Sequence, residues 1–475
     1  MLRKFAKTKI LATLGPASDS MEVLSELIEA GVDAFRLNFS HGNEEYFRNL
    51  FTLIDELSIN KSLPISILVD LQGPKIRIGE LESAEVEIKT GQTIEVFCDG
   101  RKGNEKVISC SYHNLIVDAA IGDKILIDDG LIQLRVSEKR ASSLLCDIVE
   151  GGILRQKKGM NLPGMRLTTP AITEIDYKNL EFALQFRVDF IALSFVRSSD
   201  DILSLRKWLT ERGKKIPIIA KIEKPEAVDK FQKILEVSDG IMVARGDLGV
   251  ELQPEQVPII QKQLIRECNV QGKLVITATQ MLESMIHNPV PTRAEASDVA
   301  NAVLDGTDVV MLSGETSIGK HPVEAVRRMN AILIHTESHL PFSSNLDFRV
   351  PLNLEDNLFD STAKAINSIS NQVNAKVIVA FTHFGRKAHK LSKFRPNKPI
   401  IAISDSLKTL SELNMHWGIQ AYYSDDIDNE DIAIEKAKQI LTANQLAKKG
   451  DMVLFTASAP TPYLGRRTWI QFVII

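Results

Sequence analysis

Short runs of β-branched and aliphatic residues recur along the first 312 residues, separated by amphipathic helical patterns. The runs are continuous rather than alternating, which is typical of parallel strands covered on both faces. Among the helices between them we predict Ser20–Ala30, ending at Gly31, and Val257–Asn269, ending near Gly272. Eight strands are predicted, at Thr8–Leu14, Val32–Asn38, Ile65–Asp70, Val188–Ser194, Ile216–Lys221, Gly240–Ala244, Leu274–Thr279 and Asp308–Leu312.

An eightfold alternation of strand and helix predicts a (β/α)8 barrel, also called a TIM barrel. Residues 73–169 interrupt it with short strands and Gly- and Asp-rich turns, which predict an inserted all-β lid domain with hinges at Gly73–Pro74 and Pro163–Gly164. The remaining residues, 1–72 and 170–345, approach the ~250 residues typical of such a barrel. The predicted strands of the insert are Val86–Lys89, Thr93–Phe97, Lys124–Ile127, Ile132–Val136 and Ser143–Val149.

A second alternation of helices and strands occupies residues 346–475 and predicts a separate C-terminal α/β domain. It is long enough to enclose a core of its own. The predicted elements are helices Ser361–Gln372, Gly385–Lys393 and Asn429–Lys448, and strands Lys376–Phe381, Ile400–Ile403, Met452–Phe455 and Trp469–Ile475.

Composition narrows the class of partner. The chain has 475 residues and a net charge of −4, so it lacks the positive field that nucleic acids or anionic membranes attract. No apolar stretch approaches the ~18 residues of a membrane span, and the run Ile10–Leu14 is too short for a signal peptide. The four cysteines show no CxxC pairing. We therefore expect a cytoplasmic protein with small-molecule partners.

Polar residues gather at the ends of the predicted barrel strands, where barrels of this kind carry their reactive groups. A lone charged residue at a strand end is usually a solvated surface group, but six such ends together favour a functional site. The second strand ends at Arg36, Asn38 and Ser40, the third at Asp70, the fifth at Lys221 and Glu223, the sixth at Arg245-Gly246-Asp247, the seventh at Thr279 and the eighth at Ser313–Thr316.

These residue types suit a phosphorylated, anionic substrate. Glu223 and Asp247 could share Mg²⁺, because a two-carboxylate site completed by substrate oxygens and water suits this hard cation. Arg36, Lys221 and Arg77 would surround the carboxylate pair with positive charge. Phosphoryl transfer needs such neutralisation of charge more than it needs a covalent nucleophile.

Five segments in register resemble the pyruvate kinase family, and the resemblance covers the barrel, the insert and, more weakly, the tail. It implies transfer of the phosphoryl group of phosphoenolpyruvate to ADP, which gives pyruvate and ATP in the last step of glycolysis. The segments are Arg36–Gly42, Ala220–Glu223, Met242–Glu251, Thr277–Met285 and Leu312–Thr316.

The resemblance also implies roles for individual residues. Arg36 would hold the phosphate, and Lys221 would stabilise the moving phosphoryl group. Thr279 would lie beside the enolate, where a proton reaches carbon through ordered water. Gly246 and Asp247 would complete the substrate site, and Glu223 and Asp247 would bind Mg²⁺ or Mn²⁺. The nucleotide-contacting positions would be Asn38, Phe39, Ser40, His41, Arg77 and Lys158, with the insert closing as a lid that excludes water.

One departure concerns potassium. Many pyruvate kinases hold K⁺ with residues matching Asn38, Ser40, Asp70 and Leu71, and carry a glutamate where this chain has Lys75. The ammonium group of Lys75 could supply the charge that K⁺ supplies elsewhere, as in the potassium-independent branch of the family. The competing interpretation is that Lys75 only pairs with a nearby carboxylate, which would leave the K⁺ ligands functional.

A second departure lies in the tail, where the family often binds a phosphorylated effector in a loop before a helix. Here the candidate residues are Thr382, Gly385, Arg386 and Lys387, but Phe384 stands at a position that is commonly serine. A solvated basic helix is an equal alternative to an allosteric site. The resemblance further implies a homotetramer.

Two other functions are weighed against a kinase. Barrels that bind Mg²⁺ and pyruvate also perform aldol and lyase chemistry, but they would need neither the lid nor the ADP-contacting positions Arg77 and Lys158. An inactive metabolite sensor would require the loss of a catalytic group, and each expected group is present in the sequence.

Overall fold

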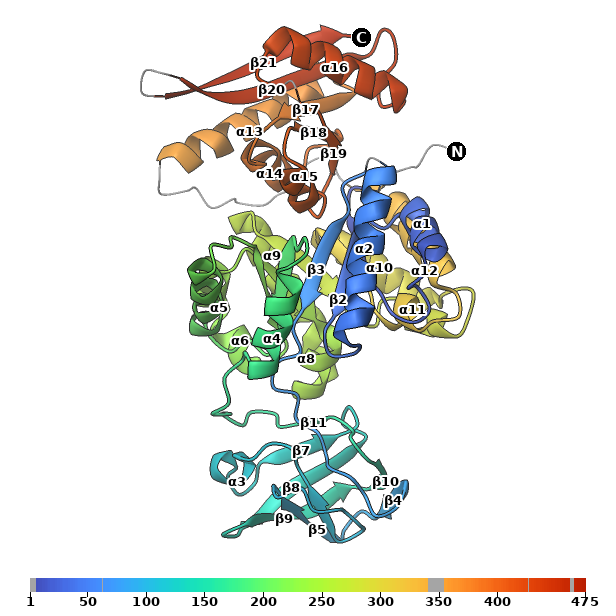
Figure 1. Ribbon diagram of the computed structural model, residues 1–475, viewed down its shortest axis with the longest axis vertical. Coiled ribbons are helices and arrows are strands. Elements are labelled where there is room, and N and C mark those ends of the chain that lie inside the picture. The colour runs from blue at the N-terminus through green and yellow to red at the C-terminus, as the bar shows by residue number, and fades with distance from the viewer. Residues whose placement is uncertain (1–5, 62, 341–353, 426, 462–464) are drawn as a thin grey trace.

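The computed structural model describes residues 6–61, 63–340, 354–425, 427–461 and 465–475, and shows three parts stacked along one axis (Figure 1). The middle part is a closed barrel of eight parallel strands, which confirms the predicted fold. In barrel order the strands are β1 (Lys9–Thr13), β16 (Val309–Leu312), β15 (Leu274–Ala278), β14 (Gly240–Ala244), β13 (Ile218–Ile222), β12 (Phe190–Leu193), β3 (Ser66–Asp70) and β2 (Ala34–Asn38).

Helices surround the barrel and begin and end at the expected signals. Ser20 caps the first helix, and Gly31 and Gly272 end two helices with positive φ angles of 137° and 71°. The helices are α1 (Met21–Ala30), α2 (Glu44–Asn60), α4 (Glu174–Ala183), α5 (Ser199–Glu211), α6 (Pro225–Asp229), α7 (Phe231–Val237), α8 (Arg245–Glu251), α9 (Val257–Gln271), α10 (Arg293–Asp305), α11 (Gly314–Ser317) and α12 (Pro322–Glu337), with 3-10 helices η1 (Pro254–Gln256) and η2 (Glu283–Ile286).

The insert between β3 and α4 lies below the barrel in Figure 1 and has a hydrophobic core of its own. Its main sheet is a curled half-barrel with strand order β11-β7-β8-β9-β5-β6, and β10 pairs with β4. The sequence did not predict β6, α3, β10 or β11, because each is too short to show a periodic pattern. The elements are β4 (Glu85–Ile88), β5 (Thr93–Phe97), β6 (Val107–Ser109), α3 (Leu115–Asp118), β7 (Lys124–Ile127), β8 (Ile132–Lys139), β9 (Ser143–Glu150), β10 (Gly152–Arg155) and β11 (Met160–Asn161).

The C-terminal part is an α/β sheet of order β19-β18-β17-β20-β21, in which only β21 runs antiparallel. The expected boundary between residues 345 and 346 lies outside the described residues. Helix α13 extends N-terminal of the predicted start, and α15 and β19 were not predicted. The elements are α13 (Leu354–Gln372), β17 (Val377–Phe381), α14 (Arg386–Lys393), β18 (Ile400–Ser404), α15 (Leu407–Leu413), β19 (Ile419–Tyr423), α16 (Glu430–Ala443), β20 (Met452–Thr461) and β21 (Gly465–Ile474).

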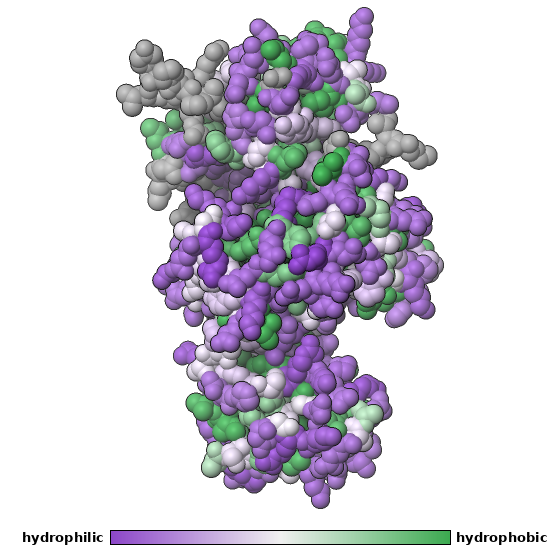
Figure 2. Space-filling view, viewed as in Figure 1, coloured by the Kyte–Doolittle hydropathy of each residue, from purple (hydrophilic) through white to green (hydrophobic). Residues whose placement is uncertain are grey.

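The C-terminal part closes the amino-terminal end of the barrel. Met415, which follows α15, is fully buried in the cluster of side chains that fills the barrel interior. The amide of Asn414 donates to the carbonyl oxygens of Asp33 and Pro64, which binds α15 to the starts of β2 and β3. The visible surface is mostly hydrophilic (Figure 2). No described helix is both long and apolar enough to cross a membrane.

Candidate active site

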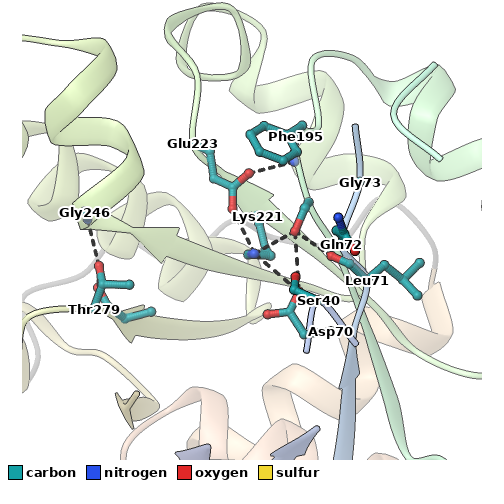
Figure 3. Close-up of polar contacts among 12 residues, drawn as sticks. Ser40, Asp70, Leu71, Gln72, Gly73, Phe195, Lys221, Glu223, Gly246 and Thr279 are labelled. Carbon is teal, nitrogen blue, oxygen red and sulfur yellow. Dashed lines mark hydrogen bonds and ion pairs between the residues drawn. The ribbon is translucent and has the colours of Figure 1, made fainter. Parts of the chain in front are cut away.

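A buried network of charged side chains lies where the barrel strands end (Figure 3). The Lys221 ammonium on β13 is 2.9 Å from Glu223 Oε1 and 3.3 Å from Asp70 Oδ1 at the end of β3. Arg36 on β2 donates from Nε to the other Asp70 oxygen at 2.7 Å. Asp70 and Glu223 are almost fully enclosed. Residues from three different strands therefore meet at one point, as the pattern of strand ends predicts.

The charges in this network set the protonation of each member. Burial alone would lower the pKa of Lys221, but the carboxylates of Asp70 and Glu223 raise it above its usual value. Burial would likewise raise the pKa of Asp70, but Lys221 and Arg36 hold it below its usual value. Lys221 therefore stays an ammonium and Asp70 a carboxylate at neutral pH, so the site keeps fixed charges ready for an anion.

Glu223 and Asp247 form the candidate metal site. Burial and then the charge of Asp247 raise the pKa of Glu223, against the opposing effect of Lys221. The Glu223 oxygens accept from Lys221 and from the Phe195 N–H at 2.7 Å. A divalent cation between the two carboxylates would relieve their repulsion, so the donor set fits a site completed by substrate oxygens and water. The described residues contain no cluster of three or more metal-ligating His, Cys, Asp or Glu side chains.

Thr279 and Gly246 lie on the other side of the barrel mouth (Figure 3). Thr279 directly follows β15, the strand opposite β3, and Gly246 is at the start of α8, which follows β14. The Thr279 hydroxyl accepts from the Gly246 N–H at 2.7 Å and donates to the Ala278 carbonyl at 2.6 Å. A Cβ on Gly246 would lie 3.3 Å from that hydroxyl oxygen, which is closer than most real contacts. Glycine therefore allows the close approach that this hydrogen bond requires.

Of the candidate nucleotide residues, Arg77 and Lys158 line a cleft of about 350 Å³ between barrel and insert, which Lys75 and Asp247 also line. Asn38, Phe39, Ser40 and His41 are not among the residues that line it. Partial burial and the charges of Lys75, Arg77 and Arg36 lower the pKa of His41, which reports a positive potential at this mouth. Lys158 pairs with Asp128 at 2.8 Å on the insert. The Phe39 ring is buried and stacks on Phe47, so of this residue only the backbone can face a nucleotide.

The residues at the expected potassium position are already engaged with other groups. Both Asp70 oxygens contact cations, and the Leu71 carbonyl accepts from the Ser194 hydroxyl at 2.8 Å. The Asn38 side-chain oxygen accepts from the Ser40 N–H at 3.2 Å. Asp70, Leu71 and Asn38 therefore each already have an ion-pair or hydrogen-bond partner among the described residues.

Lys75 is half-buried above this position. Burial and the neighbouring Arg77 and Lys221 lower its pKa, while Asp247 and Asp70 act in the opposite direction. Within the described parts of the chain, no carboxylate lies within ion-pair distance of the Lys75 ammonium. The interpretation that Lys75 serves a neighbouring carboxylate in a simple ion pair therefore gains no support from the geometry.

The candidate effector residues lie far from this site, at the end of β17 and the start of α14. Gly385 adopts a left-handed conformation with φ of 74° before α14. Arg386 is paired with Glu355 at 2.7 Å and Asp356 at 3.0 Å, both on α13. Lys387 is buried, and burial lowers its pKa to about 8. Thr382 is also buried.

Three residues that organise the site are not predicted from the sequence. Ser194, just after β12, accepts from Lys221 at 2.7 Å, and the Phe195 N–H holds Glu223. Asp176 on α4 accepts from the Gln72 and Gly73 N–H groups at 3.0 and 3.2 Å, which fixes the entry to the insert. The rule that strand ends carry function would have found Ser194 had it been applied to the fourth strand.

Fold and site together define an enzyme that handles a phosphorylated anion at the mouth of a (β/α)8 barrel. Residues 5–326 match the family model of the pyruvate kinase barrel domain, and residues 360–467 match the model of the pyruvate kinase alpha/beta domain. The chain therefore belongs to the pyruvate kinase family, and its activity is that of this family of phosphotransferases: phosphoenolpyruvate and ADP give pyruvate and ATP in glycolysis.

Relatives across the whole chain agree. The pyruvate kinases of Staphylococcus aureus strains MRSA252 and USA300 are each 41% identical over 471 residues, which are 99% of this chain and 80% of each relative. The crystal structure of a pyruvate kinase from Cryptosporidium parvum superposes with a TM-score of 0.93 at 36% identity and covers 100% of this chain and 98% of that one.

Proposed function

We propose that the network around Lys221 is the centre of phosphoryl transfer from phosphoenolpyruvate to ADP. The observation that carries this proposal is the meeting of Arg36, Asp70 and Lys221 from separate strands, with Lys221 kept as an ammonium. Arg36 binds the phosphate of the substrate, and Lys221 stabilises the negative charge on the phosphoryl group as it moves.

Glu223 and Asp247 are the residues that would hold Mg²⁺, or Mn²⁺ in its place. The family typically uses a divalent metal, and a cation there would neutralise the charge of substrate oxygens. Lys221 keeps one Glu223 oxygen oriented and Phe195 the other, so the carboxylate is fixed before substrate arrives. Gly246 and Asp247 complete the substrate site from the start of α8.

Thr279 serves the proton-transfer half of the reaction. After phosphoryl transfer the product is the enolate of pyruvate, and a new C–H bond must form at its methylene carbon. The Thr279 hydroxyl is too weak an acid to give up its own proton at neutral pH, so it orients a water that relays a proton from bulk solvent to the carbon. The electron pair of the C=C bond forms the C–H bond, and the carbonyl group is restored.

On the nucleotide side, ADP contacts Asn38 at the end of β2 and the next three residues, Phe39, Ser40 and His41, together with Arg77 and Lys158 on the insert. The insert, residues 73–169, then acts as a lid on the barrel of residues 1–72 and 170–345. Closure would exclude water from a transfer that hydrolysis would otherwise waste.

We further propose that the enzyme works without K⁺, with Lys75 supplying the monovalent charge. The engaged state of Asp70 and Leu71 supports this. The test is an assay of pyruvate formation with Mg²⁺ in Na⁺ and then in K⁺ buffer, for the parent and for Lys75→Glu. We expect equal parent rates in both buffers and a variant that needs K⁺; strong K⁺ activation of the parent would refute the role of Lys75.

We assign regulation to the C-terminal domain, residues 346–475. A phosphorylated effector would bind at Thr382, Gly385, Arg386 and Lys387, and would compete with the α13 carboxylates for Arg386. We propose a homotetramer in the cytoplasm, as the family resemblance implies. A titration with sugar phosphates and nucleotides, followed by activity and by sedimentation velocity, tests both statements.

A further inference from the structure

The backbone at Thr279 has an unusual conformation. Its φ angle is 67°, and that of Gln280, which follows, is 53°. Two consecutive side-chain-bearing residues in the left-handed region are strained, because the Cβ of each crowds the backbone carbonyl. Such strain persists only where surrounding contacts hold it in place. The contacts that hold this turn therefore decide where the Thr279 hydroxyl points.

One side chain makes most of those contacts. The guanidinium of Arg245, at the start of α8, donates to the carbonyl oxygens of Thr279 at 2.7 Å and Gln280 at 3.2 Å. Its Nε lies 3.3 Å from the carbonyl oxygen of Ala278, the same oxygen that the Thr279 hydroxyl contacts. The planar fork of arginine thus spans three consecutive carbonyl groups, which lysine could not do.

Arg245 is itself fixed. Its Nη1 donates to both oxygens of Asp298 on α10, each at 2.7 Å, and only a tenth of its side chain is exposed. The next residue, Gly246, donates its N–H to the Thr279 hydroxyl. Two residues at the start of α8 therefore hold Thr279: Arg245 binds the backbone carbonyl of Thr279, and the Gly246 N–H binds its hydroxyl.

We propose that Arg245, oriented by Asp298, is a positioning residue for proton transfer to the enolate. This inference rests on the proposed role of Thr279. By holding three carbonyls in the strained turn, Arg245 aims the Thr279 hydroxyl and the water that it orients at the methylene carbon. Arg245 serves one half of the reaction, because the described phosphoryl-transfer network of Arg36, Asp70 and Lys221 shares no hydrogen bond with it.

Separate measurement of ATP and pyruvate tests the proposal. In the parent the two products form at equal rates, because each enolate is protonated before release. Arg245→Lys and Asp298→Asn should release enolpyruvate, which is not yet protonated at its methylene carbon, so that the initial rate of pyruvate formation falls behind that of ATP formation on the order of tenfold. The KM values for phosphoenolpyruvate and ADP should change by less than about twofold, since Arg245 binds neither substrate.

Arg206→Lys is the matched control. Arg206 also pairs with an aspartate, Asp239, and donates to a backbone carbonyl, that of Val237, but at the amino-terminal end of the barrel. This variant should keep the two product rates equal. Since Asp298→Asn changes a partly exposed side chain, it remains informative if Arg245→Lys fails to fold.

The variant Thr279→Ala distinguishes a failure of the proposed role of Arg245 from a failure of the proposed role of Thr279. If it uncouples ATP from pyruvate while Arg245→Lys and Asp298→Asn do not, the positioning role is overturned and the role of Thr279 stands. If Thr279→Ala leaves the products coupled, the proposed role of Thr279 fails, and this inference fails with it. A proportional loss of both products in the Arg245 and Asp298 variants would indicate only a structural role and would overturn the proposal.

Discussion

At the scale of single residues, the site depends on how each buried charge is satisfied. Lys221 contacts two carboxylates and the Ser194 hydroxyl, so its charge is balanced without water. Such a network is costly to leave incomplete, because a buried group that loses its partner keeps the full cost of its desolvation. Neutral partners such as Ser194 should therefore matter for activity as well as for stability.

Replacing Ser194 by alanine tests this expectation. The change removes the acceptor of one Lys221 N–H and the donor to the Leu71 carbonyl, so we expect a loss of about 1 to 3 kcal/mol in the free energy of unfolding. We also expect kcat to fall about tenfold, because Lys221 is held less firmly. Urea unfolding and steady-state assays measure the two effects.

The matched control is Ser58→Ala. Its hydroxyl also donates to a backbone carbonyl, that of Leu63 at 2.7 Å, but at the end of α2. This variant should lose stability without losing kcat. If Ser194→Ala retained the full kcat of the parent, Ser194 would be a structural residue alone.

At the scale of elements, α14 and the turn after α15 bring two histidines against the barrel. The rings of His389 and His416 lie 4.5 Å apart among Lys9, Lys273, Lys390, Lys393 and Arg395. Burial and then Lys390, Lys273 and Lys393 lower the pKa of His389 to about 4. Burial and then His389, Arg395 and Lys9 lower the pKa of His416 well below its usual value. Both rings are therefore neutral at physiological pH.

The lowered pKa of a histidine determines in which direction the free energy of unfolding changes with pH. The unfolded chain binds these protons near pH 6.5, whereas the folded chain resists them down to about pH 4. The contribution is thus fully present above pH 6.5 and is lost as the pH falls through this window. For His389 alone the loss should reach about 3 kcal/mol once the pH has fallen through the whole window.

Thermal unfolding of the parent and of His389→Asn between pH 7.5 and pH 4.5 measures the effect. The variant should show a flatter pH dependence than the parent. His335→Asn, which changes an exposed histidine on α12, should follow the parent curve. Parallel curves for parent and His389→Asn would show that His389 contributes nothing to acid sensitivity.

At the scale of the whole molecule, the C-terminal domain has apolar clusters of its own but also places Met415 in the core of the barrel, while the insert has a separate core. Met415 fills the barrel interior together with residues from the barrel strands, such as Leu11 and Met311. The apolar residues of the insert form a separate cluster. We therefore expect barrel and C-terminal domain to unfold as one cooperative unit and the insert to unfold separately.

Met415→Ala should destabilise the barrel itself, although the residue belongs to the C-terminal part. Deletion of a fully buried methionine side chain costs about 2 to 5 kcal/mol. Hydrogen exchange should show faster opening of barrel strands such as β1 and β16, with unchanged protection in the insert. An effect confined to the C-terminal sheet would contradict the role of Met415 in the core of the barrel.

The sequence by itself determined the eight strands, the α/β character of both larger parts and the convergence of Arg36, Asp70, Lys221 and Glu223 at one mouth. These features follow from local periodicity, which each stretch of the chain carries by itself, and from the fixed direction of parallel strands.

Only the tertiary structure decided which partner each group takes. Ser194 contacts Lys221, and the Phe195 N–H contacts Glu223. Met415 lies inside the barrel, and carboxylates of α13 pair with Arg386. Each of these contacts joins segments that are far apart in the chain. The same is true of the Arg245 fork on the Thr279 turn. Local pattern places a residue on a face of its element, but hydrogen-bond geometry and close packing between distant elements choose its neighbour.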